Sequence, residues 1–273
     1  MSEVFWRLGF LGGSLEVNAT GETMLGPEHP TIGRSDLPSP VPPHPLDALV
    51  TAQRARKYRQ VLARRSERLV VVVEDCFDPH NATAIVRTCD AFGLQRVVVT
   101  TGRNSFKVNP KVSQGSHLYM DLQVFPEISA AYAALRAEGY RILVTDLAAG
   151  AVSSPDHLRP LLDERPLAIV FGNEGSGVSP AASQLADGHF LIPMVGFPQS
   201  LNLSVSVAAT LWALRGRELT ADQPGDLSPA RQQALYDHWI RTHKGDVADA
   251  ALRHASATQE TGKHGEELDT FHK

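Results

Sequence analysis

The sequence predicts an α/β domain with a mostly parallel sheet and helices on both faces of that sheet. Short apolar runs rich in β-branched residues, such as 69–73 and 167–171, have the composition of strands that are buried on both faces. Helical patterns separate these runs, and strands that alternate with helices are typical of a parallel sheet. The alternation extends over residues 66–220, which we therefore expect to form the core domain.

Each element is predicted from its periodicity and from the turn residues at its ends. Gly93 and Gly139 follow helical patterns at the position where helices commonly end in a left-handed residue. The loop 74–81 is rich in turn residues and separates a strand from a helix. The predicted strands are 69–73, 96–100, 141–145, 167–171 and 189–192, and the predicted helices are 46–65, 82–92, 128–138, 179–185, 204–217 and 228–242.

Three further segments flank the core domain. Residues 1–44 include a proline-rich stretch without periodicity, so we expect an extended, disordered segment there. Residues 45–65 are predicted to form a basic helical extension. Residues 221–273 are predicted to form a C-terminal helical extension that ends in a polar tail.

The composition is that of a globular protein with an ordinary core. Hydrophobic residues make up 42% of the chain, which is typical of that class, and no apolar run is long enough to cross a membrane. The N-terminus lacks the pattern of a secretory signal. The two cysteines, Cys76 and Cys89, are too few for a disulfide framework and lack metal-site spacing. We therefore expect a cytoplasmic protein without a metal ion.

Basic residues gather in one segment although the whole chain is slightly acidic. The net charge is −4, but residues 54–68 hold seven basic side chains against one acid, Glu67. A solvated helix face and a phosphate-binding surface fit this pattern equally well. The seven residues are Arg54, Arg56, Lys57, Arg59, Arg64, Arg65 and Arg68.

A glycine-rich loop, residues 172–179, follows the buried strand 167–171 and precedes a short helix. Open parallel sheets bind ligands at such strand ends, and glycines there allow close approach of the backbone to a ligand. The spacing of Gly172, Gly175 and Gly177 matches neither the Walker nor the dinucleotide fingerprint. By itself the loop predicts either a ligand site of unnamed chemistry or a simple turn.

The segment 192–208 leaves the last predicted strand of the domain and enters a helix. It carries Ser200, Asn202 and Ser204 between apolar residues. Each of these side chains can cap the helix, but three polar residues at alternate positions are more than one cap requires. The segment is therefore a second candidate for a ligand-binding loop.

Three segments resemble, in the same order, the signature motifs of SpoU-type RNA ribose methyltransferases. Residues 78–87 are similar to the first motif, whose core is an Asn and an Arg six residues apart, here Asn81 and Arg87. Residues 172–177 are similar to the second motif. Residues 192–205 look like the third motif of the TrmH-like tRNA branch. The ordered set is more specific than any single motif.

The resemblance, which covers residues 66–217, implies the fold of the family and its methyl donor. The C-terminal part of such a sheet is tied into a deep trefoil knot, the cofactor is S-adenosylmethionine, and two subunits form a homodimer. The apolar face of the helix 204–217, with Leu211, Trp212 and Leu214, is compatible with that pairing. The positions that correspond to the cofactor site are Thr145, Gly172, Asn173, Gly177, Ile192, Pro193, Met194 and Leu201.

Methyl transfer to a ribose requires a 2′-hydroxyl that lies in line with the methyl group and loses its proton. The resemblance assigns the base to Arg87, helped by a phosphate of the substrate. Because a guanidinium loses its proton reluctantly, an arginine that clamps the phosphate is an equally good interpretation. A surface salt bridge to Asp78 or Asp90 is the alternative without a catalytic role. The other predicted catalytic residues are Asn81, Glu174, Ser200 and Asn202.

These features predict an enzyme that methylates the ribose 2′-hydroxyl of RNA, with a D-loop guanosine of tRNA as the expected target. A ribosomal RNA methyltransferase is one alternative, although residues 1–65 are too proline-rich for a separate RNA-binding domain. A non-catalytic knotted RNA-binding protein is another, against which the retained motif residues argue. A nicotinamide dehydrogenase would need a Gly-x-Gly-x-x-Gly turn, which residues 75–80 lack. The candidate RNA-binding residues are Arg54, Arg56, Lys57, Arg59, Arg64, Arg65 and Arg87.

Overall fold

The structure is a computed structural model that describes residues 15–17, 23–25, 43–102, 104–109, 113, 115–146, 151–152, 154–220, 223–247 and 249–250. The chain divides into two units, Met1–Asp36 and Leu37–Lys273. In the first unit, β1 (Leu15–Val17) and β2 (Thr23–Leu25) pair as antiparallel strands, which the sequence does not predict. The predicted disorder of the surrounding residues lies outside the described part of the chain.

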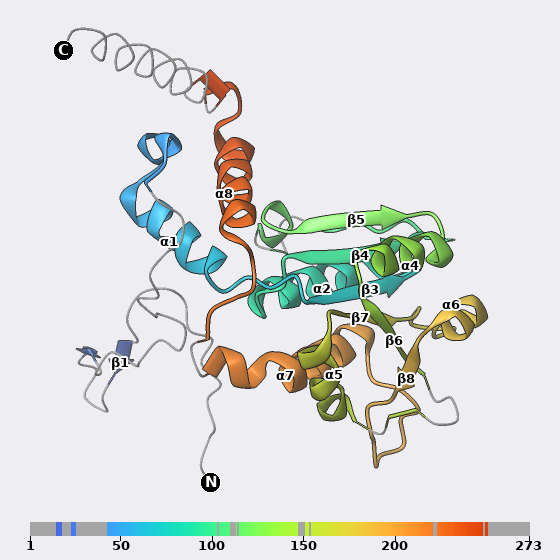
Figure 1. The fold of residues 1–273 in the computed structure, drawn as a ribbon. Helices are drawn as coiled ribbons and strands as arrows, with labels where there is room; N and C mark the ends of the chain where they lie inside the picture. The colour runs from blue at the N-terminus through green and yellow to red at the C-terminus, as the bar shows by residue number, and fades with distance from the viewer. Residues whose placement is uncertain are drawn as a thin grey trace, which may run out of the picture. The chain divides into compact units, whose positions relative to one another are not determined.

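The second unit is built on one six-stranded sheet (Figure 1). The strands lie in the order β5-β4-β3-β7-β6-β8, and every neighbouring pair is parallel, so the predicted parallel sheet is confirmed. The apolar pattern does not predict β5, because this edge strand contains Asp121 and Gln123 and lacks a continuous apolar run. The six strands are β3 (Leu69–Glu74), β4 (Arg96–Thr100), β5 (Asp121–Phe125), β6 (Arg141–Thr145), β7 (Leu167–Phe171) and β8 (Gly188–Phe190).

Helices cover both faces of the sheet, as predicted. Successive side chains of β3 point to opposite faces of the sheet. Leu69, Val71 and Val73 pack against one group of helices, and Val70 and Val72 pack against the other. Burial on both faces explains the continuous apolar run of this strand. The first group is α2 (Pro79–Ala91), α5 (Arg159–Glu164) and α7 (Leu203–Thr220), and the second is α4 (Ile128–Ala137) and α6 (Pro180–Leu185).

The helical extensions at the two ends of the domain pack on each other. Their small apolar core is centred on Tyr58, Tyr236 and Trp239, whose rings meet edge to face. The predicted helix 46–65 is two elements, because Thr51 is extended and caps the second of them. The elements of these extensions are η1 (Pro45–Leu49), α1 (Ala52–Leu62) and α8 (Pro229–Lys244).

Two short 3-10 helices, η2 (Ser116–Leu118) and η3 (Pro155–Leu158), are also present among the described residues of this unit. Within the described residues, no helix has both the length and the apolar character to cross a membrane. The same residues include no group of three or more His, Cys, Asp or Glu side chains arranged to hold a metal ion.

The strand order changes direction between β3 and β7, and this point defines a crevice. The chain continues from β3 to β4 and β5 on one side, whereas β7, β6 and β8 lie on the other. Loops that leave the carboxyl ends of β3 and β7 therefore run apart, and ligands of open parallel sheets bind at such a point. The first of these loops, residues 75–78, leads into the motif-like segment 78–87, and the second, residues 172–179, contains the segment 172–177.

Candidate active site

The side chain of Glu174 lies at the centre of the candidate site. It belongs to the loop after β7 and reaches the loop after β3. Its Oε2 accepts a hydrogen bond from the Phe77 amide at 3.0 Å. Its Oε1 accepts from the Asp78 amide at 3.2 Å, the Asn81 side chain at 3.0 Å and the Cys76 thiol at 3.2 Å. Glu174 therefore bridges the loop after β7 and the loop after β3.

These donors determine the charge of Glu174. Partial burial acts to raise its pKa, but hydrogen bonds from Asn81, the Phe77 amide and Cys76 outweigh this effect and hold the pKa at about 2. Glu174 is therefore ionised at neutral pH and acts only as an acceptor. Burial and the hydrogen bond to Glu174 raise the pKa of Cys76 to about 12, so this thiol stays protonated and is a poor nucleophile.

Asn81 extends the network from Glu174 to the third motif-like segment. Its Oδ1 accepts a hydrogen bond from the Nδ2 of Asn202 at 3.0 Å. Asn202 also caps α7, because its Oδ1 accepts from the Ser204 amide at 2.9 Å and the Ser204 hydroxyl at 2.7 Å. One chain of hydrogen bonds therefore joins Glu174, Asn81 and Asn202, which come from the second, first and third motif-like segments.

Arg87 lies on the exposed side of α2, six residues after Asn81. Its guanidinium makes no hydrogen bond or ion pair with any other residue that the structure describes. The alternative salt bridges are absent among these residues: Asp78 caps the start of α2, and Asp90 pairs with Arg65. The guanidinium is therefore available to an external anion.

Asp75 ties three loops together, although the sequence does not single it out. It follows β3 with a φ of 52°, a left-handed conformation that costs a residue with a side chain about 1–3 kcal/mol. Its carbonyl accepts from Asn173 Nδ2 at 2.7 Å and from Asn104 Nδ2 at 3.1 Å. Its carboxylate accepts from the Asn104 amide at 2.7 Å. The tolerance of Asp for left-handed backbone is the one signal in the sequence.

The loop after β7 requires a glycine at position 172. Asn173 and Gly177 exchange two backbone hydrogen bonds of 2.9 Å, so the loop folds back on itself. A Cβ on Gly172 would lie 2.1 Å from the carbonyl carbon of Gly177, which no real contact allows. Gly177 itself has a φ of 68°. Asn173 closes the turn by accepting from the Gly175 amide at 2.8 Å.

The residues predicted to bind the cofactor follow three neighbouring strands. Thr145 ends β6, Gly172 follows β7, and Ile192 lies just beyond β8. Because these parallel strands are adjacent in the order β7-β6-β8, their carboxyl ends meet at one edge of the sheet. The hydroxyl of Thr145 donates to the Val170 carbonyl at 3.2 Å, so this side chain joins β6 to β7.

The segment after Ile192 supplies the remaining predicted residues, and most of it is open to solvent. Met194 is 38% exposed and Leu201 is 36% exposed, so both offer apolar surface to a ligand. Pro193 and Ser200 are exposed as well. Unlike Asn202, Ser200 makes no hydrogen bond to another described residue.

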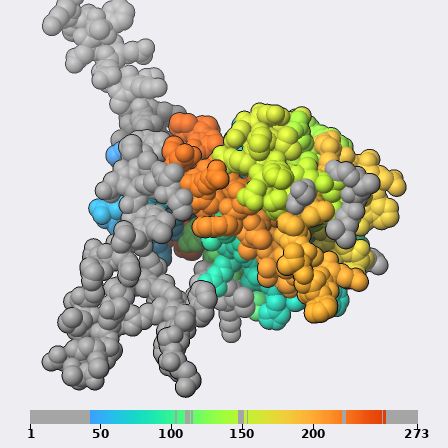
Figure 2. Space-filling view, turned by 90° about the horizontal axis from the view of Figure 1, so that it is seen from below, coloured from blue at the N-terminus to red at the C-terminus, as the bar shows by residue number. Residues whose placement is uncertain are grey.

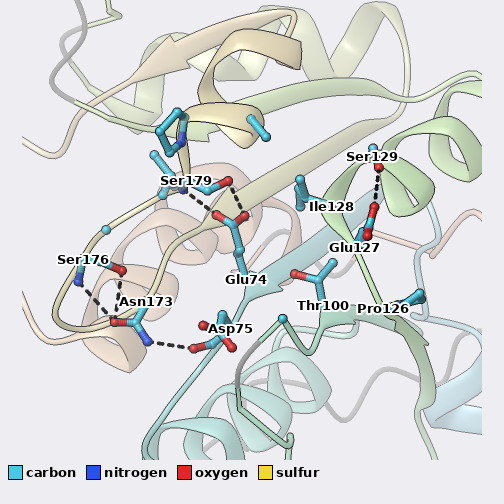
Figure 3. A pocket seen from close by; sticks show the side chains of 15 residues that line it. Glu74, Asp75, Thr100, Pro126, Glu127, Ile128, Ser129, Asn173, Ser176 and Ser179 are labelled. Atoms are coloured by element: carbon cyan, nitrogen blue, oxygen red, sulfur yellow. Dashed lines mark hydrogen bonds between the residues drawn. The ribbon is translucent and has the colours of Figure 1, made fainter.

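A cavity of about 510 Å³ lies beside the loop after β7, on the side that faces α4 (Figure 3). Asn173 and Gly177 border it, whereas Thr145 at the end of β6 does not. Glu74 projects into this region (Figure 3). Its carboxylate accepts a hydrogen bond from the Ser179 amide at 2.8 Å and another from the Ser179 hydroxyl at 2.6 Å. Ser179 in turn caps the start of α6. The loop after β7 therefore has this cavity on one side and the ends of β6 and β8 on the other.

The structure corrects the prediction that Arg65 binds RNA. Arg65 is only 1% exposed; it pairs with Asp90, donates to the Leu94 carbonyl at 2.6 Å and lies over the Trp239 ring. These contacts anchor the helical extension to the core domain. A buried guanidinium with this set of partners cannot reach a phosphate.

The other basic residues of the segment divide into two groups. Arg59 is partly buried, because it pairs with Asp47 and lies over the Tyr236 ring, so its role is also structural. Arg64 is partly buried as well. Exposed basic side chains come from α1, namely Arg54, Arg56 and Lys57.

An exposed apolar stretch runs from the loop after β8 into α7. Val195 and Phe197 are fully exposed, and Trp212 is 62% exposed. Leu211 and Leu214, which the sequence groups with Trp212 on a dimer face, are instead buried in the core. The surface in Figure 2 that the bar colours for residues near 200 includes the loop after β8.

Comparison with known proteins identifies the family of this chain. Residues 68–212 match the SpoU rRNA Methylase family, and this match spans more than half of the chain. The chain belongs to the SpoU methylase family. The three motif-like segments, residues 78–87, 172–177 and 192–205, all lie within this match.

Relatives of this SpoU-family chain carry names of RNA methyltransferases. A tRNA (guanosine(18)-2′-O)-methyltransferase of Thermus thermophilus is 36% identical over 194 residues, which cover 70% of this chain and 97% of that protein. The Escherichia coli K12 protein of the same name is 35% identical over 64% of this chain and 77% of its own length. A 23S rRNA (guanosine(2553)-2′-O)-methyltransferase of Bacillus subtilis is 32% identical over 55% of this chain and 58% of its own.

A solved structure supports the same family. The crystal structure of the A. aeolicus TrmH/SpoU tRNA modifying enzyme superposes with a TM-score of 0.61 at 30% sequence identity. The superposition covers 69% of this chain and 95% of that one. The SpoU domain of this chain therefore has the same fold as that enzyme.

We predict that Glu174→Gln destabilises the protein in a pH-dependent way. Because the pKa of Glu174 is lowered from 4.5 to about 2 in the folded state, its contribution to stability is complete above about pH 4.5 and is lost as the pH falls towards 2. The loss in free energy of unfolding, measured by urea titration, should be larger near pH 6 than near pH 3. Glu164→Gln, at an exposed carboxylate of α5, is the matched control. A Glu174→Gln effect that does not change with pH would contradict this account.

Proposed function

We propose that this chain transfers a methyl group from S-adenosylmethionine to a ribose 2′-hydroxyl of RNA, with a guanosine of tRNA as the target. The observation that carries the proposal is the hydrogen-bond chain from Glu174 through Asn81 to Asn202. It brings three motif-like segments together, and Arg87 lies on the helix that carries Asn81. The names of the T. thermophilus and E. coli relatives support the tRNA substrate.

The ends of β6, β7 and β8 fit the methyl donor. The backbone of Gly177 and Val178 packs against Gly172 so closely that no side chain fits there, which fixes the shape of the loop after β7. Met194 and Leu201 provide partly exposed apolar surface that suits an adenine ring. The bound donor supplies an electrophilic methyl group on its sulfonium. The residues that we propose to hold it are Thr145, Gly172, Asn173, Gly177, Ile192, Pro193, Met194 and Leu201.

Arg87 has the chemistry of a phosphate clamp that orients the ribose. Its planar guanidinium can hold two phosphate oxygens at once, and it has no competing partner among the described residues. Since a guanidinium rarely gives up its proton, the clamped phosphate is the better acceptor for the hydroxyl proton. Glu174 stays ionised and holds Asn81 and Asn202 in place through the network, and the exposed Ser200 is available to the substrate.

We expect Arg87→Ala to lower the methylation rate by about 100-fold or more, because positioning and proton removal each contribute factors of this size. Arg87→Lys keeps the charge but not the two parallel hydrogen bonds, so it should restore only part of the rate. The measurement is transfer of labelled methyl groups to unmodified tRNA, followed by nucleoside mapping.

Arg136→Ala, on α4 at the other face of the sheet, is the control and should keep wild-type activity. Methylation of a base, or full activity in Arg87→Ala, would refute the proposed mechanism. Mapping with ribosomal RNA in place of tRNA tests the alternative that the B. subtilis relative raises. No methylation of either RNA by the wild type would favour a non-catalytic RNA-binding protein.

We propose that the exposed cations of α1 bind the RNA backbone. Arg54, Arg56 and Lys57 lie on the solvent side of that helix. Each phosphate contact adds about 0.7–0.9 to the slope of log affinity against log salt concentration. A variant with glutamine at all three positions should therefore bind tRNA more weakly and with a slope lower by about 2. An unchanged slope would exclude α1 from the RNA interface.

The course of the chain after β8 supports the proposal of a trefoil knot. β8 lies beyond β6, yet Asn202 returns to Asn81 on α2. Residues 191–202 therefore pass the carboxyl ends of β6 and β7. When a single molecule is pulled from its two ends, a knotted chain should reach a shorter final length than an unknotted chain of 273 residues.

We propose that the exposed apolar stretch of the SpoU domain pairs two subunits. Apolar patches of this kind commonly mark protein interfaces. Phe197→Asp should therefore yield a monomer by light scattering, whereas Val247→Asp, beyond α8, should leave the mass unchanged. The same dimer mass for Phe197→Asp would contradict the assignment. A cytoplasmic location, predicted from the cysteine usage, stays a prediction.

A further inference from the structure

Phe77 has a large apolar side chain that is exposed to solvent. Its side chain is 71% exposed, although it adjoins the most tightly bonded part of the candidate site. Among the described residues, no aromatic ring or cation stacks on it. The hydrogen bonds of the site use its backbone amide, so the phenyl ring itself has no role in them.

The backbone that carries this ring is fixed. Cys76, Phe77 and Asp78 each donate a hydrogen bond to Glu174. Asp78 then caps α2 through the His80 amide at 2.8 Å. The ring therefore keeps only its two side-chain torsions, and holding it against a ligand costs little conformational entropy.

The position of the ring relates it to the helix that we propose binds the RNA. It precedes α2, the helix that carries Asn81 and Arg87, and its backbone amide contacts Glu174 in the loop after β7. Arg87 lies eight residues after the first residue of α2, which at 1.5 Å per residue is about 12 Å along the helix axis, so an RNA strand of a few nucleotides held at Arg87 is long enough to reach the start of the helix. Sequence-tolerant contacts to unpaired RNA are made by aromatic rings, because every base has a π face.

We propose that Phe77 stacks on a base of the RNA substrate, next to the ribose that is methylated, and so positions the strand. This inference rests on the proposed function. The alternative occupant is a second copy of the chain, which also presents exposed apolar residues, and the test below separates the two.

The test compares Phe77→Ala, Phe77→Leu and Phe77→Trp in the full chain. Stacking on one base accounts for about a tenfold change in affinity, so Phe77→Ala should raise the KM for tRNA by about that factor. Its affinity for S-adenosylmethionine, measured by calorimetry, and its Tm should stay at the wild-type values. Phe77→Leu should resemble Phe77→Ala, because it keeps apolar area without a π face.

Phe77→Trp should restore the KM, and its additional fluorescence should be quenched when tRNA is added. Val124→Ala, at an exposed apolar residue of β5, is the matched control and should behave as wild type. A wild-type KM in Phe77→Ala, or rescue by Phe77→Leu, would overturn the stacking role. A changed molar mass in Phe77→Ala would assign the ring to a subunit contact and also overturn it. If the wild type itself does not methylate RNA, the proposed function fails, which is a separate outcome.

Discussion

The site depends on one ionised carboxylate, that of Glu174, held by donors from another loop. Four hydrogen bonds from the β3 loop and the start of α2 converge on it. None of these donors comes from a charged side chain, so the loops are joined without a salt bridge that a phosphate could displace. The hydrogen bonds of Glu174 and its donors are formed before any ligand binds. Catalysis by positioning requires such a preorganised site.

The sequence predicts the inner strands well because their environment is uniform. β3 touches helices on both faces, so its residues 69–73 are all apolar and the run is visible without alignment. The edge strand β5 has one open side and mixed composition, so its pattern is not distinctive. The motif residues Asn81, Glu174 and Asn202 are recognisable, but their mutual hydrogen bonds join residues about a hundred positions apart and need the fold.

Charge is where the sequence is least informative. Arg54 and Arg65 belong to the same basic run, yet one faces solvent and the other is enclosed by Asp90 and Trp239. The difference depends on α8, which follows more than 160 residues later and supplies the ring. The number of basic residues in the sequence run is therefore larger than the number of exposed cations that an RNA phosphate can contact. Of the six candidates between positions 54 and 65, three on α1 are exposed, and a phosphate can reach these.

Because Asn202 lies late in the sequence, the sheet can form during synthesis before the candidate site is complete. Five of the six strands of the main sheet precede residue 172, so much of the core can form early. Asn81 lacks its partner until the chain has passed back across the sheet and α7 has been capped. A nascent chain that ends before this helix therefore has a sheet but an incomplete site. Translation must proceed well into the last third of the chain, beyond Asn202 and α7, before any substrate can be engaged productively.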